Sequence, residues 1–153
     1  MLRYNLTILS IILFTSQTAL SAENDEHPCE AKTTKLMSVK STWEELYKAA
    51  LKLPSNCFDG YYAEGISDTL VRKMGQDWSG FISILMLHPK ESKFMNLILD
   101  SINATLDPDD IRIVDGLAQH WCLAELSSQC NAISEQAAAA LQDYEPKEYR
   151  NGS

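Results

Sequence analysis

The cysteines constrain what this 153-residue chain can fold into more than any other feature of the sequence. There are four of them, and an even number in an exported chain predicts disulfide pairs rather than free thiols. Of the three connectivities that four cysteines allow, we favour Cys29 with Cys57 and Cys122 with Cys130, because each pair flanks a single predicted element or turn. Zinc is the alternative ligand, but there is no C-x-x-C motif and the histidines lack zinc-finger spacing. We therefore expect two disulfides and no metal.

The first residues predict export. Arg3 precedes the apolar run Leu6–Phe14, which has the length of a signal-peptide core and is too short to span a bilayer. Small and polar residues follow, so we expect residues 1–21 to be a signal peptide that is cut after Ser21 or Ala22. No cysteine stands at the cleavage point, and no later apolar run is long enough for a membrane span. The mature protein is therefore expected to be periplasmic or secreted, without membrane contact after cleavage.

The mature chain is expected to be strongly acidic. The whole sequence has 21 acidic and 13 basic side chains, and the leader contains only Arg3 of these, which leaves 12 basic side chains and a net charge of −9. A surface of this charge repels the phosphate backbone of nucleic acids and also anionic lipids. If the protein has a partner, the charge favours a basic protein.

Apolar residues after the leader recur at helical spacings, and no stretch alternates as a half-buried strand would. We therefore expect an all-α fold, formed by a single compact bundle of about five helices with two disulfides. A chain of this length forms one domain. The expected organisation is an N-terminal segment over 22–35, the helical domain over 36–145 and a disordered tail over 146–153.

Local signals place the helices of the first half. The sequence Ser41-Thr-Trp-Glu44 has the form of a capping box and predicts a helix that begins near its serine. The apolar residues of Leu36–Val39 are a candidate upstream extension of this helix. A second helix is expected over Cys57–Met74. The glycines of Gly75–Gly80 then predict a turn before a short buried helix over Phe81–Leu87.

The second half predicts three further helices. The clearest start signal is Asp107-Pro-Asp-Asp110, because its first aspartate can cap a helix and proline suits the first helical position. Capping also explains these carboxylates better than a calcium loop, which needs a central glycine and a final glutamate. The helix that begins here is expected to bury a stripe that includes Trp121. The expected bounds of the three helices are about Glu91–Asn103, Asp107–Cys122 and Cys130–Tyr144.

No group of residues has the pattern of a catalytic site. Asp59, Glu64 and Asp68 are candidate acids or bases for a small hydrolase, but the spacing of four that joins Glu64, Asp68 and Arg72 is typical of a solvated ion ladder along a helix. There is no G-x-S-x-G motif, no spare thiol once the cysteines pair, and no glycine-rich phosphate loop. We therefore predict no enzymatic activity and no cofactor.

A candidate partner-binding surface lies between residues 59 and 81. Four aromatic residues occur there among glycines, a composition found at recognition surfaces as well as in cores. Two acidic residues of the same segment would orient a basic partner. The candidate residues are Tyr61, Tyr62, Glu64, Asp68, Trp78 and Phe81.

In its leader, size, acidity, four cysteines and helical pattern, the chain resembles the small periplasmic, disulfide-bridged, all-helical immunity proteins with which bacteria neutralise toxins delivered by type VI secretion. The resemblance implies a stoichiometric binder that blocks a toxin's site. No residue role is carried over from that family. Two alternatives stay open, an envelope structural or stress component and a small envelope hydrolase that uses its acidic residues. The partner's identity and the oligomeric state are not set by the sequence.

Overall fold

The computed structural model of the protein describes residues 28–144. The predicted signal peptide and the predicted tail over 146–153 lie outside this range. Every regular element within it is helical, which confirms the all-α fold class. The described elements are α1 (Glu30–Thr33), α2 (Trp43–Lys52), η1 (Ser55–Cys57), α3 (Gly60–Gln76), α4 (Trp78–Leu87), α5 (Ser92–Ser101), α6 (Pro108–His120), η2 (Ala124–Leu126) and α7 (Ser127–Gln142), where η denotes a 3₁₀-helix.

Seven α-helices lie within residues 28–144, so the expected count of about five is too low. The described part of the chain forms more and shorter helices than its apolar pattern indicates. The helix α1 is a single turn of four residues, which is too short to show a helical periodicity. The helix α4 follows α3 after one intervening residue.

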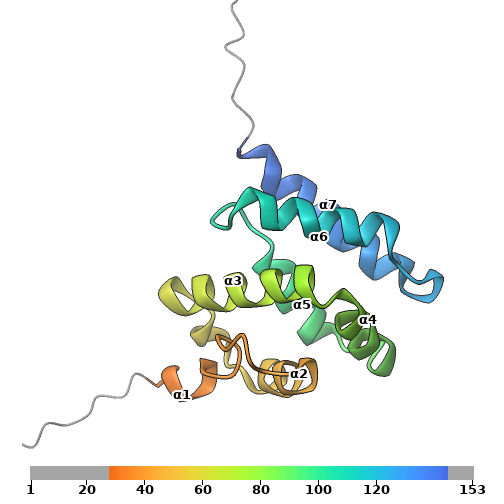
Figure 1. The fold of residues 1–153 in the computed structure, drawn as a ribbon. Helices are drawn as coiled ribbons and strands as arrows, with labels where there is room; N and C mark the ends of the chain where they lie inside the picture. The colour runs from red at the N-terminus through yellow and green to blue at the C-terminus, as the bar shows by residue number, and fades with distance from the viewer. Residues whose placement is uncertain (1–27, 145–153) are drawn as a thin grey trace, which may run out of the picture.

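The helices form two groups around a central pair. The most extensive packing is between α6 and α7, which lie side by side as an antiparallel hairpin (Figure 1). The helix α3 packs against α5 and α6, and α2 packs against α5 and α4. Figure 1 shows α3 and α5 between this hairpin and the N-terminal helices α1 and α2. One side of α3 is therefore covered by the core, and its other side is left for contact with solvent.

The core holds α3 firmly in place. Ile66, Leu70 and Met74 recur every four residues along α3 and are completely buried. Burial of an apolar side chain of this size stabilises a fold by about 1.5–3 kcal/mol, so these three residues fix the rotation of α3 about its axis. Other fully buried large side chains come from the remaining helices and loops: Leu36, Leu46, Phe81, Phe94, Ile98, Ile102, Ile111, Leu126 and Ile133.

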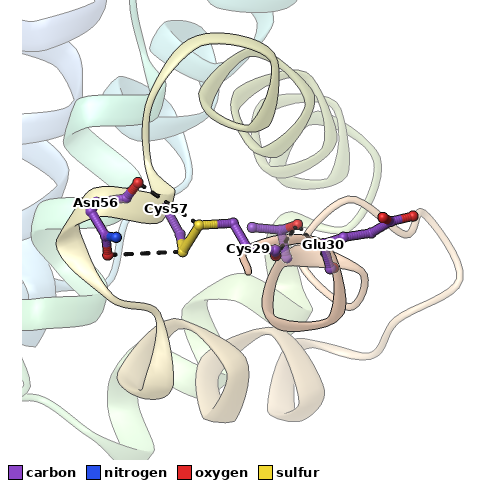
Figure 2. Close-up of a disulfide and its surroundings, with 5 residues drawn as sticks. Cys29, Glu30, Asn56 and Cys57 are labelled. Atoms are coloured by element: carbon purple, nitrogen blue, oxygen red, sulfur yellow. Dashed lines mark hydrogen bonds between the residues drawn. A yellow bond between two sulfur atoms is a disulfide. The ribbon is translucent and has the colours of Figure 1, made fainter. Parts of the chain in front are cut away.

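The first disulfide joins the start of α1 to η1. Cys29 and Cys57 are bonded, with their Cα atoms 5.2 Å apart, and Figure 2 shows the bridge between α1 and the turn at Asn56. Both cysteines are buried. The Thr33 hydroxyl, also buried, donates to the Cys29 carbonyl oxygen at 2.9 Å. Cys29 and Thr33 therefore belong to the packed part of residues 28–144.

The capping box of α2 lies one residue later than predicted. The N-cap is Thr42, whose hydroxyl accepts from the Glu45 amide, while the Glu45 carboxylate accepts from the Thr42 amide at 2.9 Å. Ser41 is buried instead, and its hydroxyl donates to the Lys35 carbonyl oxygen at 2.9 Å. Because this contact turns the chain just before α2, the segment Leu36–Val39 does not extend the helix.

The turn predicted over Gly75–Gly80 is reduced to one residue, Asp77. The helix α3 continues to Gln76 and α4 begins at Trp78. The Asp77 amide donates to the Lys73 carbonyl oxygen at 2.8 Å, and its carboxylate accepts from the Gly80 amide at 3.0 Å. A single aspartate thus ends one helix and caps the next, which allows the glycines on either side to stay helical.

The hairpin of α6 and α7 is fastened at the loop between them. As predicted, Asp107 caps α6, accepting from the Asp109 amide at 2.9 Å, and proline occupies the first turn. Cys122 and Cys130 are bonded across η2, which confirms the second expected pair. The loop between the two helices begins and ends earlier than predicted. The helix α6 ends at His120 and not at Cys122, and α7 begins at Ser127 and not at Cys130.

Candidate functional site

The exposed side of α3 presents a polar and aromatic stripe. Tyr61, Glu64, Asp68 and Arg72 recur at spacings of three and four and are all exposed. The helix begins at Asp59, whose carboxylate accepts from the Gly60 amide at 2.8 Å. Gly60 itself has a φ of 49°, in the left-handed region that favours glycine. The sequence thus brings four of the six candidate partner-binding residues, the two tyrosines and the two acids, to the surface of one helix.

Two tyrosines form the N-terminal end of this stripe. The Tyr61 side chain is 73% exposed, and its ring meets the ring of Tyr62 edge to face, with centroids 5.5 Å apart. Tyr62 is half-buried. Partial burial, followed by the nearby Glu30 carboxylate and Tyr61, raises the pKa of the Tyr62 hydroxyl. The Tyr62 ring is therefore a neutral phenol at physiological pH, beside an acidic side chain of α1.

An open pocket of about 410 Å³ lies between α1 and the start of α3. We call it the tyrosine pocket. Met37 packs against α3, since a side chain at Gly65 would overlap the Met37 methyl group. The residues that line the pocket are Glu30, Thr33, Thr34, Met37, Tyr61 and Tyr62.

Further along the stripe, an arginine links two helices. The Arg72 guanidinium lies 3.6 Å from the Asp68 carboxylate, one turn earlier on α3, and 3.8 Å from the Asp110 carboxylate on α6. The predicted ion ladder therefore forms between Asp68 and Arg72, whereas Glu64 has no ion pair within residues 28–144. The side chains of Asp68 and Arg72 are each more than half exposed, so their ion pair contributes at most about 1 kcal/mol.

The other two candidate partner-binding residues are in the core. Phe81 is fully buried between Trp43 and Trp78, with ring centroids 5.2 Å away on each side. Trp78 is 8% exposed, and its indole N–H donates to the Trp121 carbonyl oxygen at 2.9 Å. The expectation that Trp78 and Phe81 contact a partner is therefore wrong, because α4 turns both rings inward.

The candidate catalytic acids do not meet. Asp59 caps α3, Asp68 pairs with Arg72, and Glu64 is exposed between them on the outer stripe. Within residues 28–144, no group of three or more His, Cys, Asp or Glu side chains is placed to hold a metal ion. Among residues 28–144, no hydrogen bond or ion pair joins any two of these three candidate acids.

The structure exposes a large aromatic side chain that the sequence placed in the core. Trp121 is 72% exposed, and Leu123 beside it is 45% exposed. The predicted inward position assumed that α6 continues to Cys122, but the helix ends at His120 and the ring leaves the buried stripe. The sequence reasoning also missed the α1 residues of the tyrosine pocket, because α1 itself was not predicted.

Comparison of the chain with known protein families, with curated proteins and with solved structures finds no match. Two disulfides are compatible with a protein that works outside the cytoplasm. No helix in the part of the chain that the structure describes is long and apolar enough to cross a membrane.

Proposed function

We propose that the protein is an exported binding domain that recognises another protein through the exposed stripe of α3, and that it acts as an immunity-type inhibitor of an envelope-targeting toxin. The observation that carries the proposal is the Tyr61 side chain, which is 73% exposed at the end of the stripe that also contains Glu64, Asp68 and Arg72. Large exposed aromatic side chains are enriched among the residues that dominate binding free energies at protein interfaces.

The rigidity of the stripe supports this role. The three core residues of α3 fix the helix, and the Cys29–Cys57 disulfide fastens the chain just before it. A surface that is already ordered loses less conformational entropy on binding than a flexible one. Tyrosine adds to this advantage, because its ring offers a large contact area with only two side-chain torsions.

The charge of the stripe supports a basic partner. Glu64 and Asp68 are both exposed on α3, and the predicted mature chain has a net charge of −9. Complementary charge raises the rate of association more than the final affinity, and this effect is screened by salt. We therefore expect association with the partner to slow as the salt concentration rises.

The proposal is tested by capture from periplasmic extract with the mature, oxidised protein, followed by a toxin challenge in cells. The test variant combines Tyr61→Ala, Glu64→Gln and Asp68→Asn. A matched control combines Trp121→Ala, Glu125→Gln and Glu135→Gln, which removes one exposed aromatic ring and two exposed acids from other elements.

We expect the wild type and the control to recover the same protein and to protect cells. The α3 variant should bind that protein at least about tenfold more weakly, because tyrosine anchors and charged neighbours at an interface typically contribute more than 1 kcal/mol. If no protein is captured and no protection is seen, or if only the control variant loses binding, the proposal is wrong.

A further inference from the structure

The tyrosine pocket has the chemistry of a site for a cation. Its outer wall is the exposed ring of Tyr61, which meets Tyr62 edge to face at 5.5 Å. Glu30 of α1 also lines the pocket, with its carboxylate close enough to act on the Tyr62 hydroxyl, and the Met37 side chain lies against α3. Aromatic ring faces attract ammonium and guanidinium groups, and a carboxylate adds a charged hydrogen-bond acceptor.

Among residues 28–144, no basic side chain lines this pocket. Lys32, Lys35 and Lys48 instead border a separate hollow between α1 and α2. Lys35 is engaged there by Glu45 at 3.0 Å, and Lys48 by Glu44 at 3.0 Å. These lysines therefore line a different hollow from Glu30, and their ion pairs are formed with acidic residues of α2.

The threonine hydroxyl groups of α1 already donate hydrogen bonds to backbone carbonyl oxygens of the same segment. Thr33 donates to the Cys29 carbonyl oxygen, and Thr34 donates to the Glu30 carbonyl oxygen at 2.8 Å. The Glu30 side chain, by contrast, has no ion pair or hydrogen bond within residues 28–144, and the residue is exposed. Among the described residues, none occupies the Glu30 carboxylate, which is thus available to a ligand.

We propose that the tyrosine pocket binds an arginine or lysine side chain of the partner protein, with the cationic group between the Tyr61 ring and the Glu30 carboxylate. This inference rests on the proposed function, because it names the group of the partner that the surface recognises. It adds α1 to the binding surface, and the Cys29–Cys57 disulfide holds α1 to η1, the segment just before α3.

The test uses short peptides as probes and nuclear magnetic resonance of the oxidised mature protein. The probe is acetyl-Gly-Arg-Gly-amide, and its matched control contains citrulline in place of arginine, which keeps the shape of the side chain and removes its charge. The variant Glu30→Gln with Tyr61→Ala removes both proposed contacts. The control variant Trp121→Ala with Glu125→Gln removes an aromatic ring of similar exposure and an acid from another region.

We expect the arginine peptide to cause saturable shifts at the amides of Glu30, Tyr61 and Tyr62, with millimolar affinity, in the wild type and in the control variant. The citrulline peptide and the pocket variant should each weaken binding about tenfold, since a carboxylate contact and a cation–π contact together contribute on this scale. Shifts that do not saturate, or equal shifts with citrulline, would overturn the inference.

The inference and the proposed function can fail separately. If a protein is captured through the α3 stripe but its affinity does not change in the single Glu30→Gln variant, the cation pocket is wrong and the binding function stands. If the arginine peptide binds as expected but no protein is captured and cells are not protected, the pocket stands and the inhibitor function is wrong.

Discussion

Removal of either disulfide should destabilise the protein, and the two losses should differ in a definite order. The Cys29–Cys57 bridge joins residues 28 apart in the sequence, and the Cys122–Cys130 bridge joins residues 8 apart. A crosslink lowers the conformational entropy of the unfolded chain by an amount that grows with the logarithm of the loop length. At about 25 °C this relation gives about 3.6 kcal/mol for the longer loop and about 2.5 kcal/mol for the shorter loop.

Loss of packing should also destabilise the variant that lacks the Cys29–Cys57 bridge more than the other variant. Cys29 and Cys57 are 1% and 2% exposed, so alanine replacements leave two small voids in the core. Cys122 is only half-buried, although Cys130 is buried. Because a domain of this size is stable by only about 5–15 kcal/mol, loss of the longer bridge removes a large part of the folding free energy.

The assay is urea unfolding of the oxidised mature protein and of two paired variants, Cys29→Ala with Cys57→Ala and Cys122→Ala with Cys130→Ala. We expect the first pair to lose about 1 kcal/mol more than the second, with similar dependence of the unfolding free energy on urea. Equal losses, or a larger loss for the shorter loop, would refute the argument that loop length sets the stabilisation by these bridges.

Three further predictions concern single side chains. The pKa of Glu45 is lowered from 4.5 to about 2, first by the Thr42 amide and then by Lys35. The contribution of Glu45 to stability is therefore complete above about pH 4.5 and is lost towards pH 2. The unfolding free energies of wild type and Glu45→Gln should converge over that range, and a constant difference would contradict this. Lys93 donates to the carbonyl oxygens of Leu51 and Leu53 at the end of α2, at 2.7 and 2.9 Å. Lys93→Met should lower the free energy of unfolding in urea by about 1 kcal/mol. An unchanged unfolding midpoint would show that water replaces these hydrogen bonds. Asp77→Ala removes the acceptor for the Gly80 amide and should cost about 1 kcal/mol, measured as a lower Tm, with Ser79→Ala as a neighbouring control that should change the Tm little.

Helix signals that depend only on neighbouring residues could be predicted from the sequence. The start of α6 is an example, because Asp107 and the proline after it have no competing role. The start of α2 is different. Ser41 and Thr42 are adjacent hydroxyl residues, and each has a glutamate three residues later. Burial decides which of the two caps the helix, because the buried Ser41 hydroxyl donates to the Lys35 carbonyl oxygen. This contact cannot be predicted from the local sequence pattern.

The candidate surface was predictable only in part for the same reason. The spacing of four places Glu64, Asp68 and Arg72 on one side of a helix, and all three are exposed there. Whether an aromatic ring is covered depends on distant segments. The indole of Trp78 is fixed by the Trp121 carbonyl oxygen, 43 residues later in the chain. The ring of Trp121 is in turn exposed because α6 ends one residue before it.

The most direct test of the central claim is photo-crosslinking in living cells. A photoreactive phenylalanine analogue is placed at Tyr61 on α3, and separately at Glu135, an exposed position on α7. The account predicts a crosslinked adduct with one protein at position 61 and none at position 135. An adduct at position 135 alone, or no adduct at position 61 in cells that carry the cognate toxin, would contradict it.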